Sequence, residues 1–217
     1  MKELAFLVVG WLLGMAQSLL IERWQERRRR DRFVSGLHIE LCRLQTTMAI
    51  LFWNLKDRDG TVTRDDVEWV LSRTRRGAAD DDEGAGAFRA NFEKARQFTD
   101  TDFAALRKFS SHRRGGLAVS LRTYDLPLLE SQLAELGGLT DVKAVSEVLN
   151  VRAQLSMYNE TVMESRDYLD KTYDQSVTGE NRQKVMAMIE DRYQRVIDRA
   201  KWIADSIERC VVALGRP

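Results

Sequence analysis

The amino-terminal stretch from Leu4 to Arg32 constrains this chain more than any other feature. Leu4–Ile21 is a run of eighteen residues without a charged side chain, and six arginines follow it between Arg23 and Arg32. As a helix rising about 1.5 Å per residue, the uncharged run would cover roughly 27 Å, close to the thickness of a bilayer's hydrocarbon core. The pattern predicts a single transmembrane anchor over residues 1–21.

The basic residues that follow the apolar run predict the orientation of this anchor. They are Arg23, Arg27, Arg28, Arg29, Arg30 and Arg32. Basic flanks stay on the cytoplasmic side, which places the carboxyl-terminal part of the chain in the cytoplasm and Met1–Glu3 outside, at the inner membrane. Topology alone accounts for the cluster. As a functional addition, the six side chains would contact anionic lipid headgroups, each contributing about 1 kcal/mol.

Two further interpretations of the apolar run remain open. A cleaved signal peptide would carry its positive charge before the apolar run, whereas here the charge follows it. Gly10, Gly14 and Ser18 lie four residues apart and share one helix face. Small residues at that spacing let two membrane helices approach closely, which favours a homo-oligomer, although glycine is also simply common in membrane helices.

The composition is that of a folded helical domain attached to such an anchor. The chain has 217 residues, of which 31% are charged and 44% hydrophobic, and only two are prolines. Few prolines favour long helices. A net charge of +1 gives no indication of a nucleic-acid partner. Cys42 and Cys210 fall within apolar helical patterns and are predicted to be buried free thiols.

Three long segments carry apolar residues at alternating spacings of three and four, the pattern of bundle helices. Residues 22–57 are predicted to be the first bundle helix, and residues 140–217 an antiparallel hairpin that completes the bundle. The first apolar row is Val34, Leu37, Leu41, Leu44, Met48, Leu51 and Leu55. The last is Met186, Ile189, Tyr193, Val196, Ala200, Ile203, Ile207, Cys210 and Leu214.

Between these segments, residues 58–139 predict an irregular helical insert with an acidic, solvated loop at 77–87. The sequence Asp57-Arg-Asp59-Gly60 resembles the centre of an EF-hand calcium loop. In that alignment Leu55 stands at the first ligand position, which removes a main ligand. An ordinary turn is therefore preferred, with Thr63 capping the next helix. Residues 112–116 are expected to be a loop.

The fold expected from these patterns is all-α, with an anchor continuing into a bundle of three long helices. The two histidines and two scattered cysteines give no zinc spacing, and no glycine loop for phosphate follows a strand. We therefore expect no enzyme, cofactor or metal. The expected function is a membrane-tethered scaffold or sensor that binds a protein partner. The alternative is an oligomerising membrane effector, of the bacterial defence or toxin type, whose clustered anchors perturb or gate the membrane.

Overall fold

The computed structural model describes residues 2–74, 83–113, 121–139, 141–172 and 178–215. Within its helices, the side chains at 2–10, 12–16, 18, 19, 83–85, 87 and 111–113 lie outside the described set. Every regular element in these ranges is a helix, which confirms the predicted all-α class. In chain order the elements are α1 (Lys2–Asp59), α2 (Arg64–Thr74), α3 (Glu83–Ala95), α4 (Asp100–Arg113), α5 (Pro127–Ser131), the 3-10 helix η1 (Leu133–Gly138), α6 (Val142–Thr172) and α7 (Gly179–Leu214).

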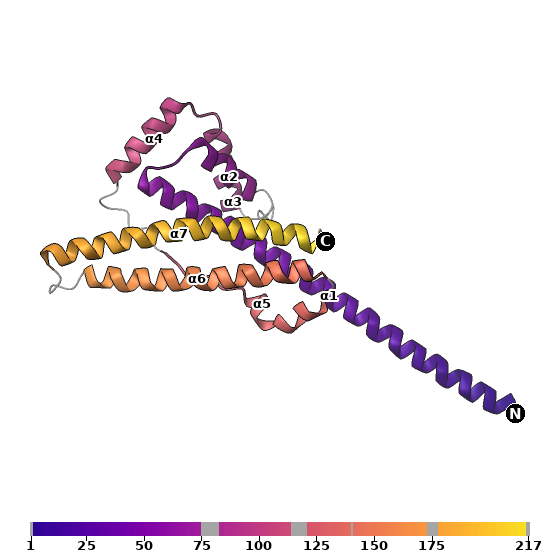
Figure 1. Ribbon diagram of the computed structural model, residues 1–217. Helices are drawn as coiled ribbons and strands as arrows, with labels where there is room; N and C mark the ends of the chain where they lie inside the picture. Colours follow the sequence, from indigo (N-terminus) through magenta and orange to yellow (C-terminus); the bar gives the residue numbers. More distant parts are fainter. Residues whose placement is uncertain (1, 75–82, 114–120, 140, 173–177, 216–217) are drawn as a thin grey trace.

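Helix α1 is continuous over 58 residues, but only its carboxyl-terminal half belongs to the bundle. Among the described side chains of α1, the first buried one is Phe33, and burial continues along one face to Leu55. The amino-terminal part of α1 extends away from the rest of the molecule (Figure 1). The bundle helix predicted from residue 22 therefore packs only from residue 33, because residues 22–32 are mostly charged and stay in solvent.

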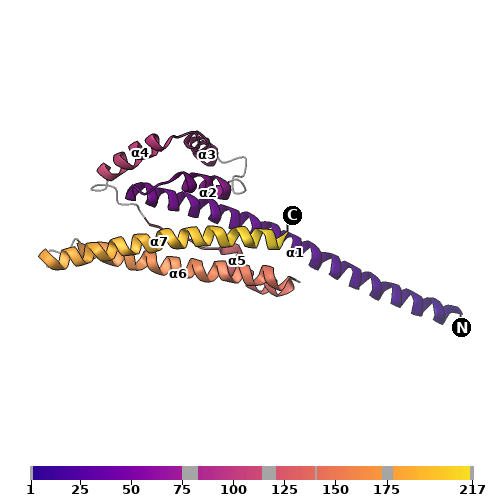
Figure 2. The same ribbon diagram turned by 45° about the horizontal axis from the view of Figure 1, so that its top comes forward.

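Helices α6 and α7 form an antiparallel hairpin, and α7 lies between α6 and α1 (Figure 2). A helix with two neighbours must bury a wide stripe, and α7 does so through consecutive buried pairs such as Val196–Ile197 and Ile203–Ala204. The bundle is therefore a layered arrangement around α7. Three equivalent rods, which the apolar spacings indicated, do not describe it.

One residue of the predicted α7 row is not part of the core. Met186 is 52% exposed, whereas the row is buried from Ile189 to Cys210. The reason lies at the end of α1, where Arg58 forms an ion pair with Glu190 at 3.0 Å. Since α1 ends one residue later, the first turns of α7 have only α6 beside them, and Met186 faces solvent.

The insert packs against α1 and α7 through aromatic side chains. Phe52 of α1 lies with its ring centre 4.6 Å from that of Trp69 in α2, and Trp53 lies 4.5 Å from Phe92 in α3. Gly60 makes the turn after α1 with a φ of 64°, a conformation that glycine adopts without steric cost. The turn predicted from Asp57 is present but begins only at Gly60, because residues 57–59 still belong to α1.

Two helices of the insert begin with the same reciprocal cap. Asp66 Oδ2 accepts hydrogen bonds from the backbone nitrogen of Thr63, at 2.9 Å, and from its hydroxyl, at 2.7 Å, while the Asp66 amide donates back to that hydroxyl. Thr99 and Asp102 repeat the arrangement at the start of α4. The predicted cap at Thr63 is thus confirmed.

Three local expectations need correction or fall outside the described residues. The acidic loop expected at 77–87 is helical from Glu83, because α3 begins there, and residues 77–82 lie outside the described set. His112 and Arg113, expected in a loop, belong to the last turn of α4. Residues 114–116 of that expected loop are also outside the described set.

Across the side chains that the structure describes, no helix has both the length and the apolar character needed to cross a bilayer. The anchor predicted at Leu4–Ile21 falls mainly on positions whose side chains lie outside that set, so it stays a prediction.

Candidate functional site

The arginine-rich part of α1 lies in solvent just before the bundle begins. The side chains from Leu20 to Arg32 are exposed except that of Arg30, which is half-buried, and the core begins at Phe33. Positions three and four apart share a helix face, so Arg23, Arg27 and Arg30 project from the same side of α1. That side faces the end of the hairpin where η1 lies.

Two residues of α1 hold α5 and η1 in place beside these arginines. The Glu40 carboxylate accepts hydrogen bonds from the backbone nitrogens of Leu128, at 2.8 Å, and Leu129, at 3.2 Å, in the first turn of α5. One turn earlier, Gly36 leaves room for Leu128, because a Cβ at that position would lie 2.6 Å from Leu128 Cδ2. The close approach of α5 sets η1, which follows directly, alongside the arginines.

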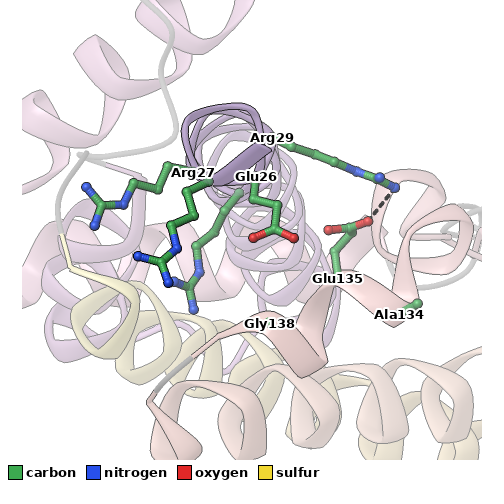
Figure 3. Close-up of a pocket in the computed structure, with 8 residues that line it drawn as sticks. Glu26, Arg27, Arg29, Ala134, Glu135 and Gly138 are labelled. Carbon is green, nitrogen blue, oxygen red and sulfur yellow. Dashed lines mark ion pairs between the residues drawn. The ribbon is translucent and has the colours of Figure 1, made fainter. Parts of the chain in front are cut away.

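The arginine segment and η1 enclose an open cleft of about 590 Å³ (Figure 3). An ion pair of 2.5 Å between Arg29 and Glu135 of η1 closes one side of it. In Figure 3, Arg29 reaches from α1 across to Glu135. The cleft is lined by Arg23, Glu26, Arg27, Arg29, Arg30, Ala134, Glu135 and Gly138.

The remaining arginines of the predicted headgroup contact lie away from this cleft. The guanidinium carbon of Arg28 sits 3.7 Å from the ring centre of Trp24, an arrangement of a cation over an aromatic face. Trp24 is 54% exposed and, with the exposed Leu20 and Ile21, forms an apolar border to the charged segment. Arg32 is exposed and does not line the cleft. The six arginines thus divide into groups that the sequence pattern did not distinguish.

The side chains of the cleft suit the binding of an anion. Four arginines and two glutamates line it, and the described lining contains no thiol, imidazole or hydroxyl group. Guanidinium groups donate paired hydrogen bonds to phosphate and carboxylate oxygens. The four arginines therefore suit the cleft to the binding of an anion.

The two cysteines lie elsewhere, in the core. Cys210 is fully buried, and burial raises its pKa from 9.0 to about 12, which keeps the thiol protonated and unreactive at neutral pH. Cys42 Sγ lies 3.8 Å from Nδ1 of His38, one turn earlier on α1. The described residues contain no group of three or more histidine, cysteine, aspartate or glutamate side chains placed to hold a metal ion.

No family model, curated protein or solved structure matches this chain.

Of the two predicted membrane-related sites, the structure describes the side chains of one, the arginine cluster. Gly10, Gly14 and Ser18 belong to α1, but their side chains lie outside the described set, so their role in association stays a prediction. The arginines are described, and η1 adds Ala134, Glu135 and Gly138 to them. Sequence reasoning missed these three, because nothing local to residues 134–138 relates them to a segment about a hundred residues earlier.

Proposed function

We propose that this protein is a membrane-tethered, non-enzymatic scaffold whose helical bundle binds a protein partner at the cytoplasmic face of the inner membrane. One observation carries the proposal: α1 is a single helix whose second half builds the core and whose first half extends beyond it (Figures 1 and 2). Residues 2–32 would extend roughly 45 Å from the bundle at 1.5 Å per residue. A rigid helix of this kind fixes the distance between an anchor and its bundle.

The order of side chains along this extension supports a placement across the bilayer. The uncharged run Leu4–Ile21 would occupy the hydrocarbon core. Exposed Trp24 would lie at the headgroup level, where tryptophan is enriched, and the arginines beyond it would lie on the cytoplasmic side. The buried core of the bundle, starting at Phe33, would then lie outside the hydrocarbon layer. The apolar, aromatic and basic side chains would therefore each lie in the part of the bilayer where such residues are commonly found.

Exposed apolar side chains on the hairpin support the binding of a protein partner. Met157 and Met163 on α6, and Met188 and Trp202 on α7, are each more than a third exposed. Methionine adapts its shape to a partner surface at low cost, so these exposed side chains are candidates for contact with a partner. We expect this protein partner to bind the bundle at the membrane surface.

Separation of cell membranes tests the tether. We expect the full-length chain to stay with the membrane pellet after washing at high salt and at alkaline pH, and a chain starting at Arg32 to be released. A full-length chain that alkaline washing releases would contradict the tether.

Capture of a partner by the full-length chain tests the scaffold. Exchange of Met157 and Met163 for glutamate should abolish capture, and exchange of the exposed Glu160 for lysine, as a control, should not.

Association through Gly10, Gly14 and Ser18 would instead favour the membrane effector. In that case the intact chain would be toxic on expression and deletion of residues 1–21 would remove the toxicity. We expect the intact chain to be tolerated.

A further inference from the structure

The cleft between α1 and η1 has two unlike walls. Arg23, Arg27 and Arg30 form the α1 wall, spaced four and three residues apart on one helix face. Ala134 and Gly138 on η1 form the opposite wall, and their small size leaves the cleft open. A volume of about 590 Å³ exceeds what one phosphate group requires and admits the polar group attached to it.

Two glutamates offset only part of the charge of the four arginines that line the cleft. Arg29 is paired with Glu135, whereas no carboxylate lies within ion-pair distance of Arg23, Arg27 or Arg30 in the described part of the chain. Arg30 is half-buried as a residue, and no carboxylate lies within ion-pair distance of it in the described ranges. A cation in that position is stabilised when an anion enters beside it.

We propose that this cleft binds the phosphate group of an anionic membrane lipid, with Arg23, Arg27 and Arg30 as its ligands. The inference deepens the proposed tether, because the same helix would bring these arginines to the headgroup level. Glu26 also lines the cleft and disfavours a bare multivalent anion. It suits a phosphodiester whose attached group donates hydrogen bonds, the chemistry of a glycerol headgroup, since a carboxylate accepts hydrogen bonds from hydroxyl groups.

Glu135 has a positioning role in this site. By pairing with Arg29 it joins η1 to α1 at one side of the cleft and partly neutralises the charge of that arginine. Lipid binding in the cleft would therefore depend on particular arginines, unlike attraction of a simple row of arginines to an anionic surface. General attraction to an anionic surface depends on the number of arginines, while binding in the cleft depends on which arginines are present.

This difference gives a charge-matched experiment. The exchange of Arg27 and Arg30 for glutamine removes two charges from the cleft, and the exchange of Arg28 and Arg32 removes two charges outside it. Binding of phosphatidylglycerol to the full-length protein in detergent is measured by native mass spectrometry, with phosphatidylcholine as the neutral lipid. We expect roughly tenfold weaker binding of phosphatidylglycerol for the first pair and less than about twofold for the second. An equal loss in both variants would overturn the cleft as the site.

Inorganic phosphate and glycerol 3-phosphate distinguish a lipid from a free anion. We expect neither, at millimolar concentration, to displace the lipid, and displacement by either would overturn the lipid as ligand. Thermal melting of each variant checks that the bundle is intact. Retention in washed membranes is recorded on the same variants. A variant that loses lipid binding but is still retained in membranes supports the cleft as the lipid site. A wild-type chain that is not retained contradicts the tether. In that case the lipid binding measured in detergent still tests the cleft.

Discussion

The indole nitrogen of Trp69 in α2 donates a hydrogen bond of 2.9 Å to Oδ1 of Asp205 in α7. Nε of Arg73, one turn further along α2, donates to the same oxygen, also at 2.9 Å. Both donors are planar groups with fixed directions, so together they set the rotation of α2 against the hairpin. A single carboxylate thereby joins the insert to the central helix of the bundle.

Loss of this carboxylate is expected to loosen the insert. The Asp205→Ala variant should lower the free energy of unfolding by about 2 kcal/mol, because two part-buried donors lose their acceptor. Urea unfolding followed by circular dichroism measures the change. The exposed Asp198, on the same helix, provides the control, and Asp198→Ala should change stability by less than about 0.5 kcal/mol. Equal effects of the two exchanges would remove the special role of Asp205.

Gly36 is predicted to govern the seating of α5 and η1 on α1. The Gly36→Leu variant should force Leu128 away, at a cost of about 1–3 kcal/mol in stability, because the extra side chain has no free volume. Hydrogen exchange at the amides of Leu128 and Leu129 should accelerate as their bonds to Glu40 are lost. In Gly36→Ala, the higher helix propensity of alanine stabilises α1 by about 1 kcal/mol. The close contact of the new methyl group with the movable end of Leu128 offsets this gain, so we expect little net change in the free energy of unfolding. Unchanged exchange in Gly36→Leu would contradict this packing.

The exchange of one buried residue of α7 should destroy the bundle, and the exchange of one exposed residue should not. Ile203 is fully buried, so Ile203→Asp places an unpaired charge in the core and is expected to unfold the protein or take the bundle apart. Met186 belongs to the same apolar row in the sequence but faces solvent, and Met186→Asp should melt within a few degrees of wild type. Equal melting temperatures for Ile203→Asp and wild type would show that the core is wrongly assigned.

The buried thiol of Cys210 predicts a loss of stability at alkaline pH. Its pKa of about 12 in the folded protein lies above the 9.0 of an exposed thiol. The unfolded chain therefore loses its proton first, and the free energy of unfolding should fall as pH rises above about 9, by at most about 1.4 kcal/mol per pH unit from this group. Urea unfolding at pH 8 and pH 10 measures the fall, which should be smaller in Cys210→Ala. An identical fall in both proteins would assign it to other groups, such as the buried Tyr158, whose pKa is also raised by burial.

Local chemistry made much of the fold predictable. Apolar residues three and four apart identified the buried faces of α1 and α7, since a helix in a bundle must hide one stripe. Thr63 was recognised as a cap because a threonine followed three residues later by an acid satisfies the free amides of a helix start. Gly60 indicated a turn after the first bundle helix, although α1 ends at Asp59, two residues later than predicted.

Relationships between distant segments were not predictable in the same way. Met186 has the same local pattern as Ile189, and only the end of α1 beside Glu190 decides that one is exposed and the other buried. The pairing of Arg29 with Glu135 depends on how α5 sits on Gly36 and Glu40, which no spacing along the chain encodes. The cleft could therefore not be predicted from the sequence, because it forms only where the arginine-rich part of α1 lies beside η1.

Labelling of single cysteines in membrane vesicles tests the tether most directly. Cysteine is introduced at Trp11, inside the uncharged run, or at the exposed Ile39 of the bundle, and inverted inner-membrane vesicles are treated with a membrane-impermeant maleimide. Cys42 and Cys210 are buried and give a low background. We expect the Ile39→Cys protein to be labelled, and the Trp11→Cys protein to be labelled only after detergent is added. Labelling of both in intact vesicles would contradict a helix that crosses the bilayer.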